Sequence, residues 1–481
     1  MTGGTQALPV MTVGLLTGFP GCGKTNEARR RAIQTPDLYV FASQSIPLIE
    51  EQRAAFHLDS PMLRVFEVHH EASSRPIERQ LSDVLDRVAR EGIGHAVVMV
   101  THKSLVEKDL AGFAGWRLYI DEAVDAVRCG RIGLSPDSCA LFARSFDLKP
   151  FGRNGWAELV PVGDRPSWVR LKRDTLLHPA SDLFEAAKAS GQVLVNLESW
   201  DDADGFDWCS VWTPHSAADF KSVTIVGASY LASLGGIICA RWMGDLIQFD
   251  VEDLSVVRTG QPSIRIHWFS ERLAGQSEWA SKEGRAALRD IAAFIGTAEP
   301  ELGFWSANKN AQDFLDAYMP GEQVRPKVAG LNCYRDLRNC ALLYGSGATP
   351  GDAILLRDFG FSKAMIRRAR EDEDIFQFAM RGALRNSDYA GQYDIYLYSR
   401  GQAETLKARL DGAGLGDIEL VAQTHVIQTS SVPAPRPATK PRPSAAEQRV
   451  RKSELQRQRR WLAASQQGRP PGAAGRPPNP A

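Results

Sequence analysis

The sequence predicts an α/β protein in which two parallel-sheet units follow one another along the chain. Short apolar runs alternate with stretches of helical spacing, an order that gives parallel strands joined by right-handed crossovers. The 481 residues allow roughly three domains on length alone, and a hydrophobic content of 43% is enough for buried cores. A glycine-rich turn separates the first apolar run from the first helical stretch, as in folds that bind phosphate at a helix N-terminus.

This glycine-rich turn is the most specific pattern in the chain. Residues 18–25 read Gly-Phe-Pro-Gly-Cys-Gly-Lys-Thr and fit G-x-x-x-x-G-K-S/T without a mismatch. An apolar run at 11–17 precedes the turn and a helix-forming stretch at 26–33 follows it, which is the context that a phosphate-binding loop requires. The alternative is an ordinary glycine-rich turn between a strand and a helix, and the complete match disfavours it.

Each residue type in this loop has a part in phosphate binding. The glycines let the backbone turn its N–H groups inward around phosphate oxygens. The lysine can then reach the β- and γ-phosphates, and the threonine hydroxyl can ligate Mg²⁺. The residues expected to bind the nucleotide here are Gly18, Gly21, Cys22, Gly23, Lys24 and Thr25. The sequence therefore predicts a nucleoside triphosphate site, with ATP and Mg²⁺ as cofactors.

A second part of this site is expected at the end of a later strand. The intervening strands and helices are predicted in the order 38–43, 46–56, 77–91 and 95–102. A further strand at 116–121 ends in Asp121 and Glu122. In a phosphate-loop fold such an Asp holds Mg²⁺ through its water shell, and the Glu polarises the attacking water. Strands ending in Asp-Glu are common, but about a hundred residues after a complete phosphate loop the pair becomes a strong signal.

The pattern changes at about residues 129–222, which we interpret as an insertion in the first unit. Five tryptophans lie between Trp156 and Trp212, and alternating runs at 156–162 and 167–172 flank a turn, as in a β-hairpin. Exposed tryptophans beside basic residues could stack nucleic-acid bases, but tryptophans in a small subdomain are more often core. The first sheet is expected to resume with strands at 222–229 and 235–240.

The second α/β unit is predicted to begin near Ser263. Its expected strands are 264–269, 302–306, 340–345 and 393–398, and its expected helices are 282–295, 311–317 and 375–384. This half of the sequence has no phosphate loop of its own. We therefore divide the chain into a first unit at 1–250, a second unit at 251–430 and a tail at 431–481.

The tail differs from the rest of the chain in charge. Residues 431–481 contain 11 Lys and Arg against 2 Glu, a net charge of +9, whereas the first 430 residues contain 46 against 55, a net charge of −9. The tail is rich in Pro, Arg, Ala and Gln without a core pattern, so we expect it to be disordered. A basic tail suits nucleic acid, and an acidic partner protein is the alternative.

Other classes of protein are disfavoured by the composition. The seven cysteines form no C-x-x-C pair, which argues against a disulfide framework and against a zinc site. The chain contains neither an apolar run of 18 residues nor an N-terminal signal pattern, so a cytoplasmic location is expected and no membrane partner.

Taken in order, these motifs resemble those of the superfamily 2 helicases and translocases of the DEAD/DEAH-like kind, over residues 12–400. The matching segments are 18–25, 41–44, 101–105, 121–123, 227–229, 305–309, 330–335 and 377–385. The resemblance implies two tandem RecA-like lobes that close on ATP. It also implies that Thr101, His102, Asn308 and Lys309 contact nucleic acid.

The last of these motifs supplies arginines that reach across the cleft to the γ-phosphate. By resemblance Gln377 binds the nucleotide, and Arg381 or Arg385 is the catalytic arginine alongside Lys24 and Glu122. The family usually spaces the two arginines by three residues and here the gap is four, so the choice between them stays open. On one helix, residues 377, 381 and 385 would share a face, and a solvated basic helix face is the alternative.

The sequence therefore predicts an ATP hydrolase that moves along nucleic acid as a helicase or translocase. DNA is favoured over RNA as the partner, and a compact helicase of this kind would suit phage or plasmid DNA replication. One alternative is a phage-type DNA-packaging ATPase, although the clustered carboxylates of its nuclease are not evident in the second half. Another is a nucleotide-dependent binding switch that unwinds nothing.

Overall fold

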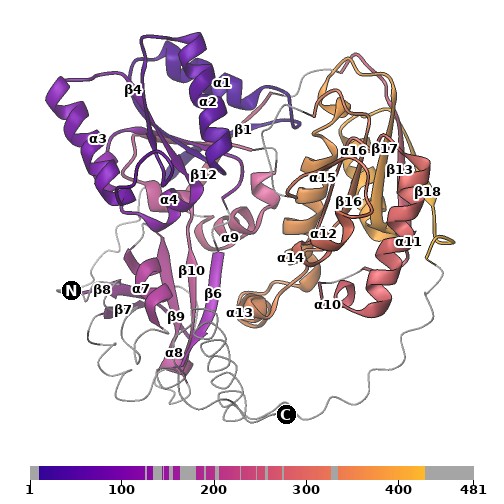
Figure 1. Ribbon diagram of the computed structural model, residues 1–481. Helices are drawn as coiled ribbons and strands as arrows, with labels where there is room; N and C mark the ends of the chain where they lie inside the picture. Colours follow the sequence, from indigo (N-terminus) through magenta and orange to yellow (C-terminus); the bar gives the residue numbers. More distant parts are fainter. Residues whose placement is uncertain are drawn as a thin grey trace, which may run out of the picture. The chain divides into compact units, whose positions relative to one another are not determined.

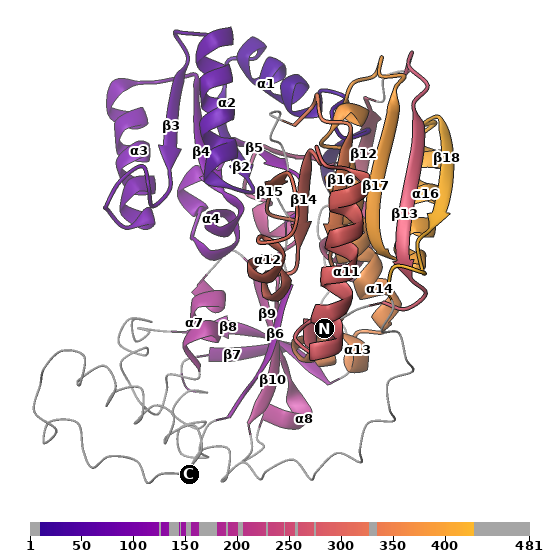
Figure 2. The ribbon, with the colours of Figure 1, turned by 45° about the vertical axis from the view of Figure 1, so that its right-hand side comes forward.

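The protein is described by a computed structural model that covers residues 10–427, apart from 125–126, 134–143, 145, 151–154, 163–179, 189–190, 201–204, 228, 245, 255–257, 274–275 and 327–333. The expected tail at 431–481 and the expected run at 167–172 lie outside these residues. Within them the chain forms two parallel sheets, each covered by helices, and one antiparallel sheet (Figures 1 and 2).

The first parallel sheet has seven strands in the order β12-β1-β11-β5-β2-β4-β3. Its strands are β1 (Met11–Thr17), β2 (Leu38–Ser43), β3 (Arg64–Val68), β4 (Ala96–Thr101), β5 (Arg117–Asp121), β11 (Ser222–Val226) and β12 (Ile247–Asp253). The helices are α1 (Lys24–Gln34), α2 (Ile46–Asp59), α3 (Ile77–Glu91), α4 (His102–Glu107) and α9 (Leu234–Met243). Strand β4 is buried along almost its whole length, as expected for a central parallel strand with helices on both faces.

The antiparallel sheet is inserted between β5 and β11, with strand order β6-β10-β9-β8-β7. Its elements are β6 (Val127–Ile132), β7 (Phe146–Pro150), β8 (Trp156–Pro161), α7 (Ser181–Lys188), β9 (Gln192–Asn196), α8 (Leu197–Trp200) and β10 (Phe206–Val211). The run at 156–161 pairs with β7 before it. Trp156, Trp208 and Trp212 are buried, so at these positions tryptophan serves the core.

The second parallel sheet has six strands in the order β15-β14-β16-β17-β13-β18. Its strands are β13 (Ser263–Ser270), β14 (Phe304–Ala307), β15 (Glu322–Gln323), β16 (Asn339–Leu343), β17 (Gln392–Ser399) and β18 (Asp417–Ala422). The α-helices are α10 (Gln276–Trp279), α11 (Lys282–Ala298), α12 (Lys309–Leu315), α13 (Ala353–Asp358), α14 (Lys363–Arg367), α15 (Glu373–Ala379) and α16 (Arg400–Gly412). Two tandem RecA-like lobes with an insertion in the first are therefore the observed architecture.

Two expected elements differ from the structure. Residues 235–240, predicted as a strand, belong to helix α9, which Ser233 caps by accepting a hydrogen bond from the Gly236 N–H at 3.1 Å. The helix expected at 375–384 ends at Ala379, and a 3₁₀ turn follows at 383–385. The chain leaves the helix near Gly382, where a Cβ would lie 2.1 Å from the Tyr393 hydroxyl, a distance only glycine tolerates.

A shared hydrophobic core joins the insertion to the second lobe. Phe359, just after α13, packs between Trp156 of β8 and Trp242 of α9, with ring centroids 4.8 and 4.5 Å apart. Arg357 of α13 pairs with Asp207 of β10 at 2.6 Å beside this core. The contact therefore fixes the second lobe against the insertion as well as against the first sheet.

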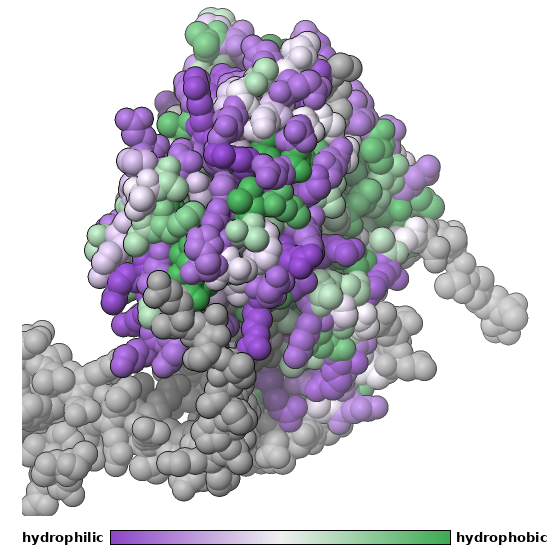
Figure 3. Space-filling model, turned by 90° about the vertical axis from the view of Figure 1, so that its right-hand side faces the viewer, coloured by the Kyte–Doolittle hydropathy of each residue, from purple (hydrophilic) through white to green (hydrophobic). Residues whose placement is uncertain are grey.

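In the described part of the chain, no helix is long and apolar enough to cross a bilayer. On the face seen in Figure 3, hydrophobic residues lie in groups among hydrophilic ones.

Candidate nucleotide site

The loop at 18–25 has the backbone shape that its glycines allow. Gly21 and Gly23 adopt φ angles of 88° and 91°, in the left-handed region that side chains with a Cβ rarely enter. Helix α1 begins directly after the second of them, at Lys24. The loop thus delivers the chain to the positive end of a helix, the position that favours bound phosphate.

Lys24 lies at the centre of this loop. Its side chain is only 5% exposed, and its Nζ donates hydrogen bonds to the carbonyl oxygens of Gly18 at 2.8 Å and Phe19 at 2.9 Å. The Sγ of Cys22 lies 3.8 Å from the same Nζ. The lysine and Cys22 therefore belong to one hydrogen-bonded loop, as the motif requires.

A hydrogen-bonded chain joins the loop to the end of β5. The Thr25 hydroxyl donates to Asp121 Oδ1 at 2.9 Å, and Gln52 Nε2 of α2 donates to Asp121 Oδ2 at 2.7 Å. The Ser43 hydroxyl donates in turn to Gln52 Oε1 at 3.3 Å. Thr25 and Asp121, predicted from separate motifs, are thus in direct contact, and their oxygens are the hard ligands that Mg²⁺ prefers. Residues 18–25 and Asp121 fit ATP and Mg²⁺ in loop shape and donor chemistry.

Glu122 follows Asp121 in an unusual conformation. It is the one non-glycine residue in the described part of the chain with positive φ, at 69°, and its N–H donates to the Val226 carbonyl of β11 at 2.7 Å. Backbone strain of this kind costs about 1–3 kcal/mol and is concentrated at functional sites.

Burial changes the acidity of both carboxyl groups. It raises the pKa of Asp121 to about 6, although the hydrogen bonds from Thr25 and Gln52 oppose the change. It also raises the pKa of Glu122 to about 8, with the charge of Asp121 acting in the same direction and the charges of Lys24 and Arg385 opposing it. A general base needs a pKa near the working pH, so Glu122 is suited to accept a proton.

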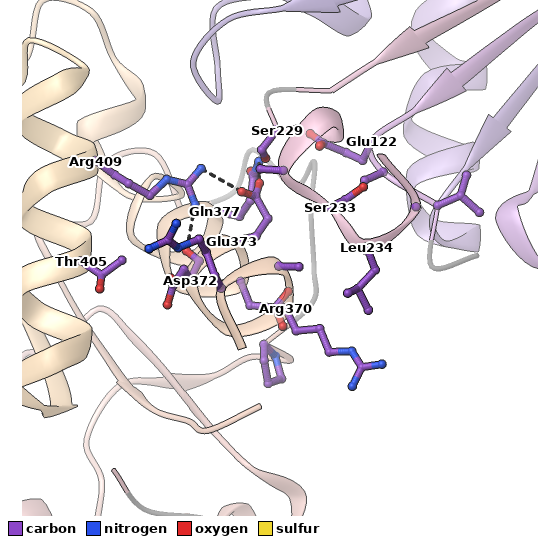
Figure 4. A pocket seen from close by; sticks show the side chains of 18 of the residues that line it. Glu122, Ser229, Ser233, Leu234, Arg370, Asp372, Glu373, Gln377, Thr405 and Arg409 are labelled. Carbon is purple, nitrogen blue, oxygen red and sulfur yellow. Dashed lines mark hydrogen bonds and ion pairs between the residues drawn. The ribbon is translucent and has the colours of Figure 1, made fainter. Parts of the chain in front are cut away.

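Glu122 opens into a cavity of about 450 Å³ between the lobes (Figure 4). Ser229 and Ser233 line it from the first lobe, and Gln377, Glu373 and Arg409 from the second. Gln377 Nε2 donates to Glu373 at 2.9 Å, and Arg409 pairs with the same carboxylate at 2.8 Å. Gln377 therefore lies across the cavity from Glu122 and is held by its own lobe.

The two candidate arginines occupy different places. Arg381 is 3% exposed, and its Nη atoms donate to the carbonyl oxygens of Arg325 and Pro326 at 3.1 Å each. The Arg385 side chain instead lies against the phosphate loop, where a Cβ on Gly21 would come within 2.4 Å of its Cγ. Because the helix ends before either residue, they do not share the helical face expected from the sequence.

The four residues expected to contact nucleic acid also differ in exposure. His102 is buried, with 8% of its surface exposed. Burial lowers its pKa to about 4, so it is neutral at pH 7. Asn308 is 5% exposed, and its amide pairs with the backbone N–H and C=O of Gly345. Thr101 caps α4 by accepting from the Ser104 N–H at 3.1 Å, and Lys309 is exposed at the start of α12. Of the four, Thr101 and Lys309 are the accessible ones.

Three polar residues close to the loop were not among the site residues predicted from the sequence, although Arg335 ends the matched segment 330–335. Gln52 holds Asp121, but a single glutamine within a helix carries no motif. Arg258 and Arg335 line a second cavity, of about 600 Å³, together with residues 19–22 of the loop and Arg385. Arginines this far apart in sequence give no local pattern, and only the fold brings them together.

Comparisons with known proteins give structural likenesses alone. No protein-family model matches the sequence, and no curated protein is similar to it at a significant level. The solved structures that resemble the fold include S. tokodaii Xpd4, with 12% identity over 85% of this chain and 96% of that one and a TM-score of 0.40. They also include Mycobacterium smegmatis helicase Lhr bound to ssDNA and AMP-PNP, with 11% identity over 84% of this chain and 47% of that one and a TM-score of 0.32.

A DEAD box protein from Methanococcus jannaschii is similar at 8% identity over 85% of this chain and 88% of that one, with a TM-score of 0.24. Likenesses of this size support no argument about function, which has to come from the site.

Proposed function

We propose that this protein hydrolyses ATP between its two lobes and uses the cycle to move along nucleic acid, as a helicase or translocase. The observation that carries the proposal is the hydrogen bond between Thr25 of the loop and Asp121 of β5, with Arg385 of the other lobe against Gly21. Phosphoryl transfer needs positioning and charge neutralisation more than covalent chemistry. These residues supply the positioning and the charge neutralisation, and they come from both lobes.

Each residue of the proposed site has its own part in hydrolysis. Mg²⁺-ATP, when bound, supplies the phosphoryl group and the metal charge. Lys24 would hold the β- and γ-phosphates, and Thr25 and Asp121 would hold the metal with its waters. Glu122 would accept a proton from the attacking water. Arg385 neutralises charge that develops on the transferred group, because it lies against the loop while Arg381 is tied to backbone carbonyls.

The full-length protein tests this proposal in an ATPase assay with and without single-stranded DNA, duplex DNA or RNA. We expect ATP turnover that nucleic acid stimulates and that Lys24→Ala abolishes without unfolding, since Lys24 contributes phosphate contact rather than packing. Turnover without stimulation by any nucleic acid would instead indicate a nucleotide-dependent switch. Absence of turnover in the folded wild-type protein would contradict the proposal.

The basic tail adds a test of the nucleic-acid partner. With +9 in residues 431–481 against −9 in the rest, the tail should supply much of the long-range attraction to phosphate, through counterion release. Removing residues from Ser431 onward should weaken binding to DNA and flatten its dependence on salt, with basal ATPase activity unchanged. The same affinity and salt dependence in both proteins would assign the tail to a protein partner.

A further inference from the structure

The cavity of about 600 Å³ beside the phosphate loop has a wall of arginines. Residues 19–22 of the loop form one side, and Arg258, Arg335 and Arg385 contribute to the other. Two aspartates, Asp336 and Asp388, also line it, so among the charged lining residues the arginines are in excess. An arginine-rich cavity next to a phosphate-binding loop suits a polyanion.

Arg258 comes from the linker between the two lobes, after β12 ends at Asp253 and before β13 begins at Ser263. Its Nη2 donates to the Asn386 carbonyl at 2.6 Å. Its Nε is buried and has no hydrogen-bond partner among the described residues. A buried N–H donor without a partner is costly, so this Nε is available to donate a hydrogen bond to an anion bound in the cavity.

Asn386 holds both additional arginines in place. Its Oδ1 accepts from Arg335 Nε at 3.2 Å and Nη2 at 3.0 Å, and its Nδ2 donates to the Arg335 carbonyl at 3.1 Å. The linker is fixed to the same turn, because the N–H groups of Thr259 and Gly260 donate to the Ser387 carbonyl at 3.0 and 2.9 Å. The turn that follows Arg385 therefore positions three arginines toward one cavity.

We propose that Arg258 and Arg335 bind the phosphates of the nucleotide together with Arg385, and that Arg258 distinguishes ATP from ADP. The inference rests on the proposed function and extends it from one catalytic arginine to a group of three, one of which lies on the linker. Arg258 contributes binding to the triphosphate rather than chemistry, because its guanidinium is held by the Asn386 carbonyl. The linker thus responds directly to the presence of the γ-phosphate.

The test is the affinity of the full-length protein for ATP and ADP that carry a fluorescent methylanthraniloyl group on the ribose. We expect Arg258→Gln to weaken ATP binding about tenfold, the loss of one charge-assisted contact, and ADP binding by less than threefold. Steady-state hydrolysis should show a raised KM with kcat nearly unchanged. Arg335→Gln should weaken ATP binding in the same direction, and Arg258→Lys should recover part of the affinity.

Arg285→Gln is the matched control, because this arginine is exposed on α11 of the same lobe. Unfolding temperatures of all variants show whether the fold survives, and Arg258→Lys keeps the test valid if Arg258→Gln is unstable. Wild-type affinities for both nucleotides in folded Arg258→Gln would overturn the inference while leaving the proposed function intact. Equal losses for ATP and ADP would also overturn it, because the contact would then not involve the γ-phosphate. A wild-type protein that binds neither nucleotide would refute the proposed function itself.

Discussion

The carboxyl groups of the two lobes are buried in opposite electrostatic environments. At the end of β5 in the first sheet, burial raises the pKa of Asp121 to about 6 and that of Glu122 to about 8. On β17 in the second sheet, Asp394 is also buried. Burial acts to raise its pKa too, but hydrogen bonds from His267 and Arg265 lower it well below the usual range.

The hydrogen-bond partners of Asp121 and Asp394 explain why the pKa values of these two carboxyl groups shift in opposite directions. Asp121 accepts from a hydroxyl and an amide, both neutral, whereas Asp394 accepts from Arg265 at 2.6 Å, His267 at 2.9 Å and Gln392 at 2.7 Å. The second lobe thus neutralises its own buried acid, as a structural ion pair does. Within the described part of the chain, Asp121 and Glu122 form no ion pair with a cation. This is the arrangement expected where a metal ion and a substrate are to bind.

The largest effect that tests this comparison is expected from Glu122→Gln. The amide matches the size of the carboxyl group but cannot accept the proton, so hydrolysis should fall by about 10²–10⁴-fold while ATP binding persists. Single-turnover hydrolysis and nucleotide affinity measure the two separately. Hydrolysis at the wild-type rate would show that Glu122, despite its strained backbone, is not the base.

The next largest effect is expected when Arg385 and Arg381 are replaced separately. Arg385→Ala should lower kcat by about a thousandfold with little change in ATP affinity, as expected for an arginine that acts on the transition state. Arg381→Ala should mainly lower the unfolding temperature, because its buried guanidinium holds two backbone carbonyls. Equal kcat losses in both variants, with unchanged stability, would show that Arg381 also reaches the nucleotide.

Much of the fold could be predicted from the sequence because parallel strands buried on both faces appear as continuous apolar runs. The strands at 38–43, 96–101 and 392–399 are of this type. Edge strand β3 was missed because only its last residue is fully buried, which leaves no apolar run. The apolar run at 235–240 gave the wrong element because a buried helix has the same composition, and the cap at Ser233 decides for the helix.

The site was predictable where its chemistry is local and unpredictable where the fold brings residues together. The loop at 18–25 is a local motif, and Asp121 and Glu122 directly follow an apolar strand. Gln52 and Arg258 lie outside every matched segment, and the tertiary structure alone brings them to the site. Arg335 ends the matched segment 330–335, but that segment gave it no role at the phosphate loop. Helix α15 ends at Ala379, before both Arg381 and Arg385, and the close approach of Tyr393 to Gly382 is a tertiary contact that the sequence does not reveal.

The second lobe offers a test of stability against pH. The pKa of Asp394 is lower in the folded chain than in the unfolded chain, so its carboxylate stabilises the fold above about pH 4. This contribution is lost as the pH falls from about 4 toward the pKa of the folded state. Asp394→Asn should therefore cost about 2 kcal/mol at pH 7 and less at pH 3, measured by denaturant unfolding. A cost that does not change with pH would mean that the ion pair with Arg265 is not the cause.

The smallest expected effect comes from two matched caps, one in each lobe. Thr101 ends β4 and caps α4, accepting from the Ser104 N–H at 3.1 Å, and Ser399 ends β17 and caps α16, accepting from the Gln402 N–H at 3.3 Å. Replacing either residue by Ala should cost about 1 kcal/mol, because an N–H of the first helical turn loses its partner.

The two cap substitutions should have different effects on the affinity of the protein for nucleic acid. Ser399 is 1% exposed and can reach no ligand. Thr101 remains partly exposed at the carboxyl end of β4, where we propose a contact with a backbone phosphate. Thr101→Ala should therefore weaken binding to single-stranded DNA a few-fold in addition to its effect on stability, because a phosphate contact is lost. Ser399→Ala should leave that binding unchanged. If both variants lose the same stability and neither loses affinity, Thr101 is a helix cap alone, and the nucleic-acid contact of the first lobe has to be sought at other residues.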